Sequence, residues 1–199
     1  MPRARFTEFD FGLTRLAGAF HQDWRHSGEP EDVVLETVHS RETVAALERD
    51  VSLMIGSVLS DGQIKLLWTA ATGGDYRFGP SESGRDLLRR FLQVSHDRQR
   101  THGSVPPETD QEWDAPLLRD RVLRAVEAAP FSVELREVLA VCVRTLSAEL
   151  AFRLLLRLHL AAFARIAPAA WVEYQKLGGA FALGEFAIGD LEFLVDDGS

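Results

Sequence analysis

The stretch LAGAFHQDW, residues 16–24, decides the fold of the first half of this 199-residue chain. Its small residues allow a neighbouring element to pack closely, and its aromatic residues supply bulk. Phe20 and Trp24 lie four positions apart, so they would share one face of a helix. We therefore predict a helix over residues 10–25 that is capped by the Asp10 side chain and buries its apolar face in a core.

The rest of the first half shows the same helical spacing of apolar residues. Ser40 and Asp61 can each cap a helix with a side-chain oxygen, and Gly73 and Gly74 can end one because glycine adopts the left-handed conformation. We see no strand-like alternation of useful length. Further helices are therefore expected after Ser40 and after Asp61.

Residues 101–113 lack apolar periodicity and contain two adjacent prolines, which is typical of a linker. Beyond it, Asp114, Ser132 and Ser147 each precede an apolar periodic segment and can cap a helix. Another helix is expected over residues 169–177, where Gly178 and Gly179 would end it. The tail would dock as one or two short helical turns, with a pair of short strands as the alternative.

The overall prediction is an all-α chain made of two packed helical modules. About five helices belong to residues 1–100 and four to five to residues 114–199, with the linker between them. This size suits one large domain or two small ones.

The charge balance bears on the kind of partner. The formal net charge is −8, and the calculated pI is about 5.3. Nucleic-acid affinity depends on clustered Lys and Arg, so we expect no nucleic-acid partner. The acidity fits either ordinary solubility or a basic protein partner, and the sequence leaves both interpretations open.

The sequence also bears on location. The basic N-terminus leads into Thr, Glu and Asp rather than an apolar run, so it does not resemble a signal peptide. The longest apolar stretch, residues 150–166, is interrupted by charged side chains and should not cross a bilayer. Cys142 is the single cysteine and lies in an apolar run, which predicts a buried thiol. We expect a cytoplasmic protein with no membrane contact.

Several polar residues invite a chemical role. His21 and His26 are five positions apart, roughly 140° around a helix, so with Asp23 they should not hold a metal. We interpret His21 and Asp23 as a partly buried polar cluster that fixes helix register, with direct contact to a partner as the alternative.

In the second half, His159 is expected to be a hydrogen-bonded core histidine, because no nucleophile or substrate is evident beside it. Arg153 and Arg157 either pair with acidic residues across the bundle or form a small basic ridge. No catalytic motif, metal motif or phosphate loop is present in the sequence, so we predict no enzyme activity and no cofactor.

The run Phe20-His21-Gln22-Asp23-Trp24 resembles the signature of the immunity proteins of bacterial contact-dependent growth inhibition systems. Members of that family carry an aromatic-His-Gln-Asp-Trp run near the N-terminus. An acidic helix, a longer helix, a small helix, a glycine-containing turn with an aromatic residue and a closing helix follow it. The resemblance places the four helices at residues 31–39, 41–59, 62–71 and 84–94 of this chain. The resemblance covers residues 8–98, and the second half carries none.

The resemblance implies an immunity protein that neutralises a cognate toxin domain by stoichiometric binding in the cytoplasm. Toxins in these systems are often nucleases, so an acidic inhibitor makes physical sense. The protein would be a monomer or a weak homodimer. The candidate toxin-binding residues are the acidic positions that follow the motif and the residues of the later turn: Glu29, Asp32, Glu36, Asp75 and Tyr76.

Two alternatives remain open. In the first, the chain is a non-catalytic helical regulatory or scaffold protein, and the motif has only a structural role. In the second, it is an enzyme that uses His21 and Asp23.

Overall fold

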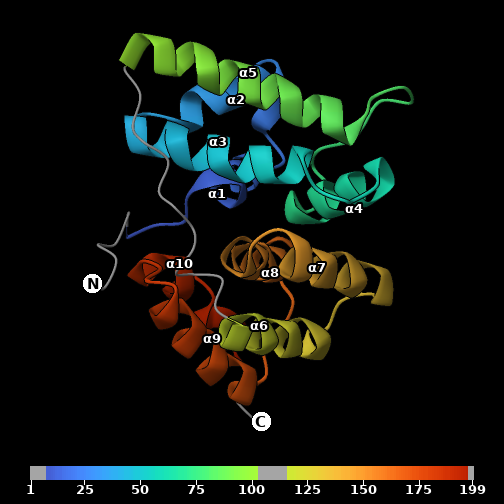
Figure 1. Ribbon diagram of the computed structural model, residues 1–199, viewed down its shortest axis with the longest axis vertical. Coiled ribbons are helices and arrows are strands. Elements are labelled where there is room, and N and C mark those ends of the chain that lie inside the picture. The colour runs from blue at the N-terminus through green and yellow to red at the C-terminus, as the bar shows by residue number, and fades with distance from the viewer. Residues whose placement is uncertain (1–7, 103–115, 197–199) are drawn as a thin grey trace. The chain divides into compact units, whose positions relative to one another are not determined.

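The computed structural model describes residues 8–102 and 116–196, and its regular structure there is helical (Figure 1). These residues contain no strand, although an isolated bridge pairs Ile166 with Val195. The all-α prediction is therefore confirmed. Backbone contacts divide the chain into an N-terminal unit, residues 11–108, and a C-terminal unit, residues 1–10 with 109–199.

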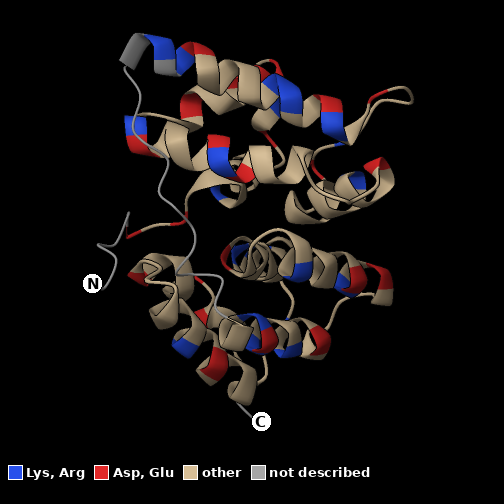
Figure 2. Ribbon diagram, viewed as in Figure 1, with Lys and Arg blue, Asp and Glu red and all other residues tan. Residues whose placement is uncertain are grey.

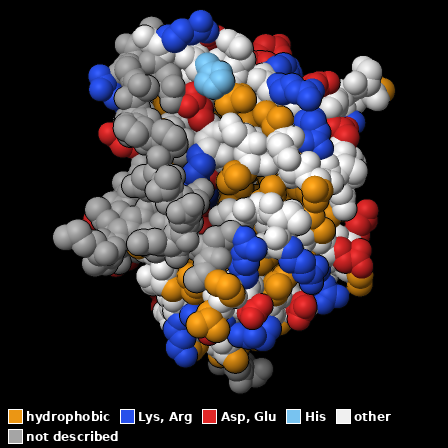
Figure 3. Space-filling model, in the orientation of Figure 1, with side chains coloured by type: hydrophobic (Ala, Val, Ile, Leu, Met, Phe, Trp, Pro, Cys, Tyr) orange, Lys and Arg blue, Asp and Glu red, His pale blue; other side chains and the backbone are white. Residues whose placement is uncertain are grey.

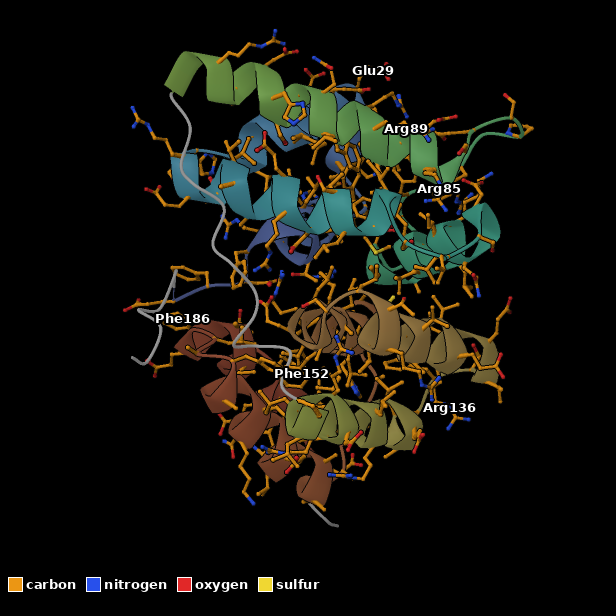
Figure 4. The ribbon with its side chains drawn as sticks, in the orientation of Figure 1. Glu29, Arg85, Arg89, Arg136, Phe152 and Phe186 are labelled. Carbon is orange, nitrogen blue, oxygen red and sulfur yellow. The ribbon has the colours of Figure 1, made fainter. Side chains whose placement is uncertain are left out.

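The first residues described belong to the C-terminal unit, whereas the sequence-based division had placed them in the first module. The backbone N–H of Phe186 donates a hydrogen bond to the carbonyl of Glu8 (2.9 Å). Phe9 stacks on the Phe186 ring, which Figure 4 labels, at a centroid distance of 5.0 Å. This short segment is thus fixed to the C-terminal unit by a backbone bond and a ring contact.

In the N-terminal unit, helix α3 packs against α1 and α5, and α5 also contacts α2 and α4. Figure 1 shows α3 and α5 running side by side. The elements are α1 (Gly12–Ala19), η1 (Trp24–His26), α2 (Pro30–Thr37), α3 (Arg41–Ile55), α4 (Asp61–Ala71) and α5 (Gly84–His102).

The first helix is shorter than predicted. It ends at Ala19, and Phe20 leaves the helix with φ −82° and ψ 64°. Phe11 rather than Asp10 precedes its first residue. Phe20 and Trp24 therefore do not share a helix face; each reaches the core from a different local structure.

Capping explains where α3 and α4 begin. Ser40 Oγ accepts a hydrogen bond from the Thr43 amide, as predicted. Ser60, rather than Asp61, caps α4. The Asp61 carboxylate instead accepts hydrogen bonds from the Ser83 hydroxyl (2.6 Å) and from the Arg85 amide (3.0 Å), so it fixes the start of α5.

Helix α5 continues to His102, beyond the predicted end at residue 94. It therefore includes the first residues of the predicted linker over 101–113. The remainder of that linker and Asp114 lie outside the described residues. The end of α4 is as predicted, because Gly73 and Gly74 adopt φ values of 64° and 84°.

In the C-terminal unit, α8 packs against α6 and α7, and α9 contacts α6 and α10. Ser132 and Ser147 cap their helices as predicted. The elements are α6 (Pro116–Ala128), α7 (Val133–Thr145), α8 (Ala148–Ala162), α9 (Pro168–Ala180), α10 (Glu185–Gly189) and η3 (Glu192–Leu194). The tail thus forms short helical turns, as expected.

The core of this unit centres on α8, whose Phe152 lies 5.8 Å from the rings of both Tyr174 and Phe181 (Figure 4). His159 is buried, as predicted. Its Nδ1 lies 2.9 Å from the carbonyl of Ala164, and its Nε2 lies 3.1 Å from the hydroxyl of Tyr174. Because a carbonyl can only accept, Nδ1 carries the proton and Nε2 accepts from the tyrosine.

Cys142 and Arg153 are two further buried side chains of the C-terminal unit. Cys142 is fully buried, which confirms that prediction, and burial raises the pKa of its thiol to about 12. Arg153 pairs with Glu149 one turn earlier on the same helix, at 2.7 Å, whereas the two alternatives considered were acidic partners across the bundle and a small basic ridge. Among the described residues, no helix is both long and apolar enough to cross a membrane.

Candidate functional site

An aromatic cluster lies beneath the motif in the N-terminal unit. The Phe20 ring is at its centre, at centroid distances of 5.0 Å from Trp24, 5.5 Å from Trp68, 5.4 Å from Tyr76 and 6.0 Å from Phe91. All these side chains are buried. Aromatic pairs at these separations add to the stabilisation that comes from burial alone. The cluster therefore gives the motif a rigid support.

One hydrogen bond ties the motif to the glycine turn. The indole N–H of Trp24 donates to the backbone carbonyl of Asp75 at 3.1 Å, and the Trp24 ring stacks on Tyr76. The left-handed Gly73 and Gly74 turn the chain so that Asp75 follows directly. Two segments that the sequence analysis singled out separately are thus neighbours in the structure.

Tyr76, which we expected at a docking surface, is instead 3% exposed. Its hydroxyl donates to the Glu82 carboxylate at 2.7 Å, and burial together with Glu82 raises the pKa of the phenol. The turn folds this ring into the aromatic cluster because the ring can bury its apolar surface there. Tyr76 is therefore a supporting residue, and Asp75, which is exposed, is the turn's polar surface residue.

The polar part of the motif, His21, Gln22 and Asp23, is exposed; we call it the motif turn. The amide of Asp23 donates to Nδ1 of His21 at 3.2 Å. The expectation of a partly buried polar cluster is therefore wrong: Phe20 and Trp24 enter the core, and the residues between them stay in solvent. The guanidinium of Arg25 lies over the Trp24 ring, 4.8 Å from its centroid.

The acidic residues after the motif have local partners. Glu29, labelled in Figure 4, precedes α2, and its amide donates to the Asp32 carboxylate at 2.9 Å. Glu36 accepts from the Ser27 hydroxyl at 3.0 Å. Because α2 begins at Pro30, Glu29 lies just before the helix, whereas Asp32 and Glu36 lie four positions apart within it. Glu29 and Glu36 are nevertheless exposed, and Asp32 is partly so.

Basic residues of α5 neutralise part of this acidic region. Figure 2 shows Lys or Arg positions along α5 interspersed with acidic ones. Arg90 lies 3.1 Å from Glu31 and 2.5 Å from Glu82. Arg85 donates to the carbonyls of Ile55 and Leu59 and so ties α5 to the end of α3. The exposed carboxylates nearest the motif in the sequence, such as Asp23, take no part in these pairs.

The exposed polar residues of the two segments lie above buried aromatic rings. The motif turn and Asp75 present donors, acceptors and carboxylates on a buried aromatic support. Within the described ranges, no group of three or more His, Cys, Asp or Glu is placed to hold a metal ion. Sequence reasoning treated the motif and the turn separately, since nothing local to residue 24 indicates its contact with residue 75.

Comparison of the chain with protein-family models, with curated proteins and with solved structures finds no match.

Proposed function

We propose that this chain is an immunity protein that binds a cognate toxin domain through the surface formed by the motif turn and Asp75. The observation that carries the proposal is the hydrogen bond from Trp24 to the Asp75 carbonyl. It holds two exposed polar segments together on a buried cluster. Such a surface fits a role in recognition, and the resemblance to immunity proteins concerns the same motif residues.

Rigidity favours tight binding. Association costs free energy when side chains and loops become ordered at an interface, and a surface that is already fixed avoids part of that cost. Here Phe20 and Trp24 anchor both ends of the motif turn, and Trp24 also anchors the glycine turn. The exposed residues would meet the toxin in the geometry that the free protein already has.

Charge indicates the class of toxin. A protein that acts on nucleic acid needs a basic surface to bind phosphates. The exposed carboxylates of Asp23 and Asp75, in a chain of net charge −8, complement such a surface and speed association. We propose a nuclease toxin whose basic substrate path is covered by this protein in the cytoplasm, at one immunity protein per toxin and with no cofactor.

The test is co-expression with the toxin domain encoded beside this gene, read as growth rescue, together with the Kd of the purified pair. The variant Asp23→Arg with Asp75→Arg should abolish rescue and weaken binding by about 100-fold, or about 2.8 kcal/mol. The matched control reverses two exposed carboxylates of the C-terminal unit, Asp120→Arg with Glu137→Arg, and should keep both rescue and affinity. Unchanged thermal unfolding would show that each variant is folded.

The outcomes separate the alternatives. Full rescue by the motif variant would place the interface elsewhere on the chain. A wild-type chain that neither rescues growth nor binds the neighbouring toxin would favour the regulatory or scaffold function. Turnover that is lost when His21 and Asp23 are replaced by Asn would favour an enzyme.

A further inference from the structure

Apolar side chains reach the surface of the C-terminal unit in several places, including the face over α6 and α9 that Figure 3 shows. One exposed pair stands apart. Phe163 is 72% exposed and Phe193 is 60% exposed, with their rings in an edge-to-face contact at 6.4 Å. We call these residues the Phe163–Phe193 patch. Beside it lies an open depression of about 730 Å³, which is lined by Arg157, Leu160, Gly189, Asp190, Glu192 and Phe193.

The backbone of Phe163 is in a conformation that side chains disfavour. It follows the last residue of α8 with φ 48° and ψ 35°, in the left-handed region. The amide of Ala164 donates to the carbonyl of His159 at 3.0 Å, so this is the helix-ending turn in which glycine is the usual residue. A residue with a Cβ is strained there, and glycine would relieve the strain.

The exposure of the Phe163 ring adds a second unfavourable term, because burial is what makes an aromatic side chain stabilising. Neither the conformation nor the environment of Phe163 is therefore explained by the stability of the unit. A residue that is both strained and exposed, as Phe163 is, is a candidate for a functional position. Exposed aromatic residues beside a depression are typical of binding surfaces.

Charge indicates what the patch would bind. Asp190 and Glu192 are exposed at the depression, and no ion pair joins either carboxylate to another described residue. Arg165 donates to the carbonyl of Phe193 and lies 3.8 Å from Asp196, so it is already engaged. Arg157 also lines the depression, but its charge interacts with the Asp10 carboxylate. The depression is thus lined by both apolar and charged residues, and its exposed carboxylates are those of Asp190 and Glu192.

We propose that the Phe163–Phe193 patch binds an amphipathic basic segment of a partner polypeptide. An apolar side chain of that segment enters the depression against Leu160 and Phe193, and its Lys or Arg side chains pair with Asp190 and Glu192. This surface belongs to the C-terminal unit and does not depend on the function proposed above.

The test measures binding of a fluorescein-labelled amphipathic peptide of Leu and Lys to the full chain by fluorescence anisotropy. A Leu and Glu peptide of the same pattern is the control probe. The Leu and Lys peptide should bind, and Phe163→Gly should raise its Kd by at least about tenfold. The same substitution should raise the melting temperature, because glycine relieves the left-handed strain.

The chain offers a matched backbone control. Ala182 has φ 52° in the same kind of turn after α9, where the Leu183 amide donates to the carbonyl of Gly178 at 2.9 Å. Ala182→Gly should therefore also raise the melting temperature but leave peptide binding unchanged. For charge, Asp190→Asn with Glu192→Gln should weaken binding and reduce its salt dependence. The control variant Glu134→Gln with Glu137→Gln neutralises exposed carboxylates of α7 and should leave peptide binding and its salt dependence unchanged.

Each contrary result overturns the proposal. Equal binding of the Leu and Glu peptide would show that charge has no part in recognition. Unchanged binding by Phe163→Gly would place the peptide elsewhere, and a lower melting temperature would show that Phe163 stabilises the fold after all. Dimerisation in sedimentation velocity that Phe163→Gly abolishes would make a second copy of this chain the occupant instead.

Discussion

Replacing Trp24 with Phe should cost more stability than the same replacement at Trp68, although the two positions are closely matched. Both indoles are 5% exposed, and both rings contact Phe20, at 5.0 Å and 5.5 Å. They differ at the indole nitrogen. Nε1 of Trp24 donates to the Asp75 carbonyl at 3.1 Å, whereas the buried Nε1 of Trp68 finds no hydrogen-bond partner within the described part of the chain.

The structure gives the sign and size of the difference. Both substitutions remove the same ring atoms, so the losses from burial and cavity formation are similar and cancel in the comparison. Trp24→Phe also removes a hydrogen bond, worth about 0.5–1.5 kcal/mol. Trp68→Phe removes an unpaired buried N–H, whose burial costs about 1–3 kcal/mol. We therefore expect Trp24→Phe to be the more destabilising by about 1.5–4.5 kcal/mol.

Urea denaturation of the full chain would measure the free energy of unfolding of each variant. The chain contains two units, so hydrogen exchange at the amides of residues 73–76 would report the N-terminal unit locally. Those amides should exchange faster in Trp24→Phe than in Trp68→Phe. Under the function proposed above, binding of the toxin should weaken only in Trp24→Phe. Equal losses of stability, or a larger loss in Trp68→Phe, would refute the role assigned to the bond with Asp75.

Two further predictions concern stability. Gly12 has φ +61°, and a Cβ added there would lie 2.1 Å from the Asp50 carboxylate. Gly12→Ala should therefore lower the free energy of unfolding by about 3 kcal/mol, because alanine is strained in the left-handed conformation and would displace a buried acceptor. Gly74→Ala, with φ +84° and nothing within 4 Å, should cost only the strain of about 1 kcal/mol; equal losses in urea denaturation would contradict this. Burial lowers the pKa of His159, so the unfolded chain binds more protons below its ordinary pKa of about 6.5 and stability should fall as the pH falls. The slope should be at most about 1.4 kcal/mol per pH unit and should be absent from His159→Gln, whereas an equal slope in that variant would assign the titration to other groups.

Local signals in the sequence predicted much of the fold. Ser40, Ser132 and Ser147 cap their helices as expected, because a hydroxyl that accepts from an amide a few residues later needs nothing beyond its own segment. The apolar spacing likewise identified the long helices, since periodicity reports which face is buried. His159 and Cys142 were predicted to be buried because they lie in apolar runs.

Contacts between distant segments were not predictable in this way. Glycine at 178 and 179 was expected to end a helix, yet α9 continues to Ala180. A Cβ at Gly178 would lie 2.7 Å from the Ile188 side chain, so this glycine allows α10 to pack closely on α9. The sequence shows that glycine is present, but whether it serves a turn or a close contact depends on a residue ten positions away.

The candidate site was also not predictable from local sequence, because its form depends on where α1 ends. A helix continued to residue 25 would have kept Phe20 and Trp24 on one face and distributed the residues between them around the others. Because α1 ends at Ala19, the chain turns, both aromatic rings enter the cluster, and His21, Gln22 and Asp23 remain together in solvent. The departure from the helical prediction therefore leaves three consecutive polar residues exposed beside Trp24, whose indole donates to the Asp75 carbonyl. Conflicts between local pattern and final structure are expected at functional sites, so this departure is an independent reason to test the motif turn as a binding surface.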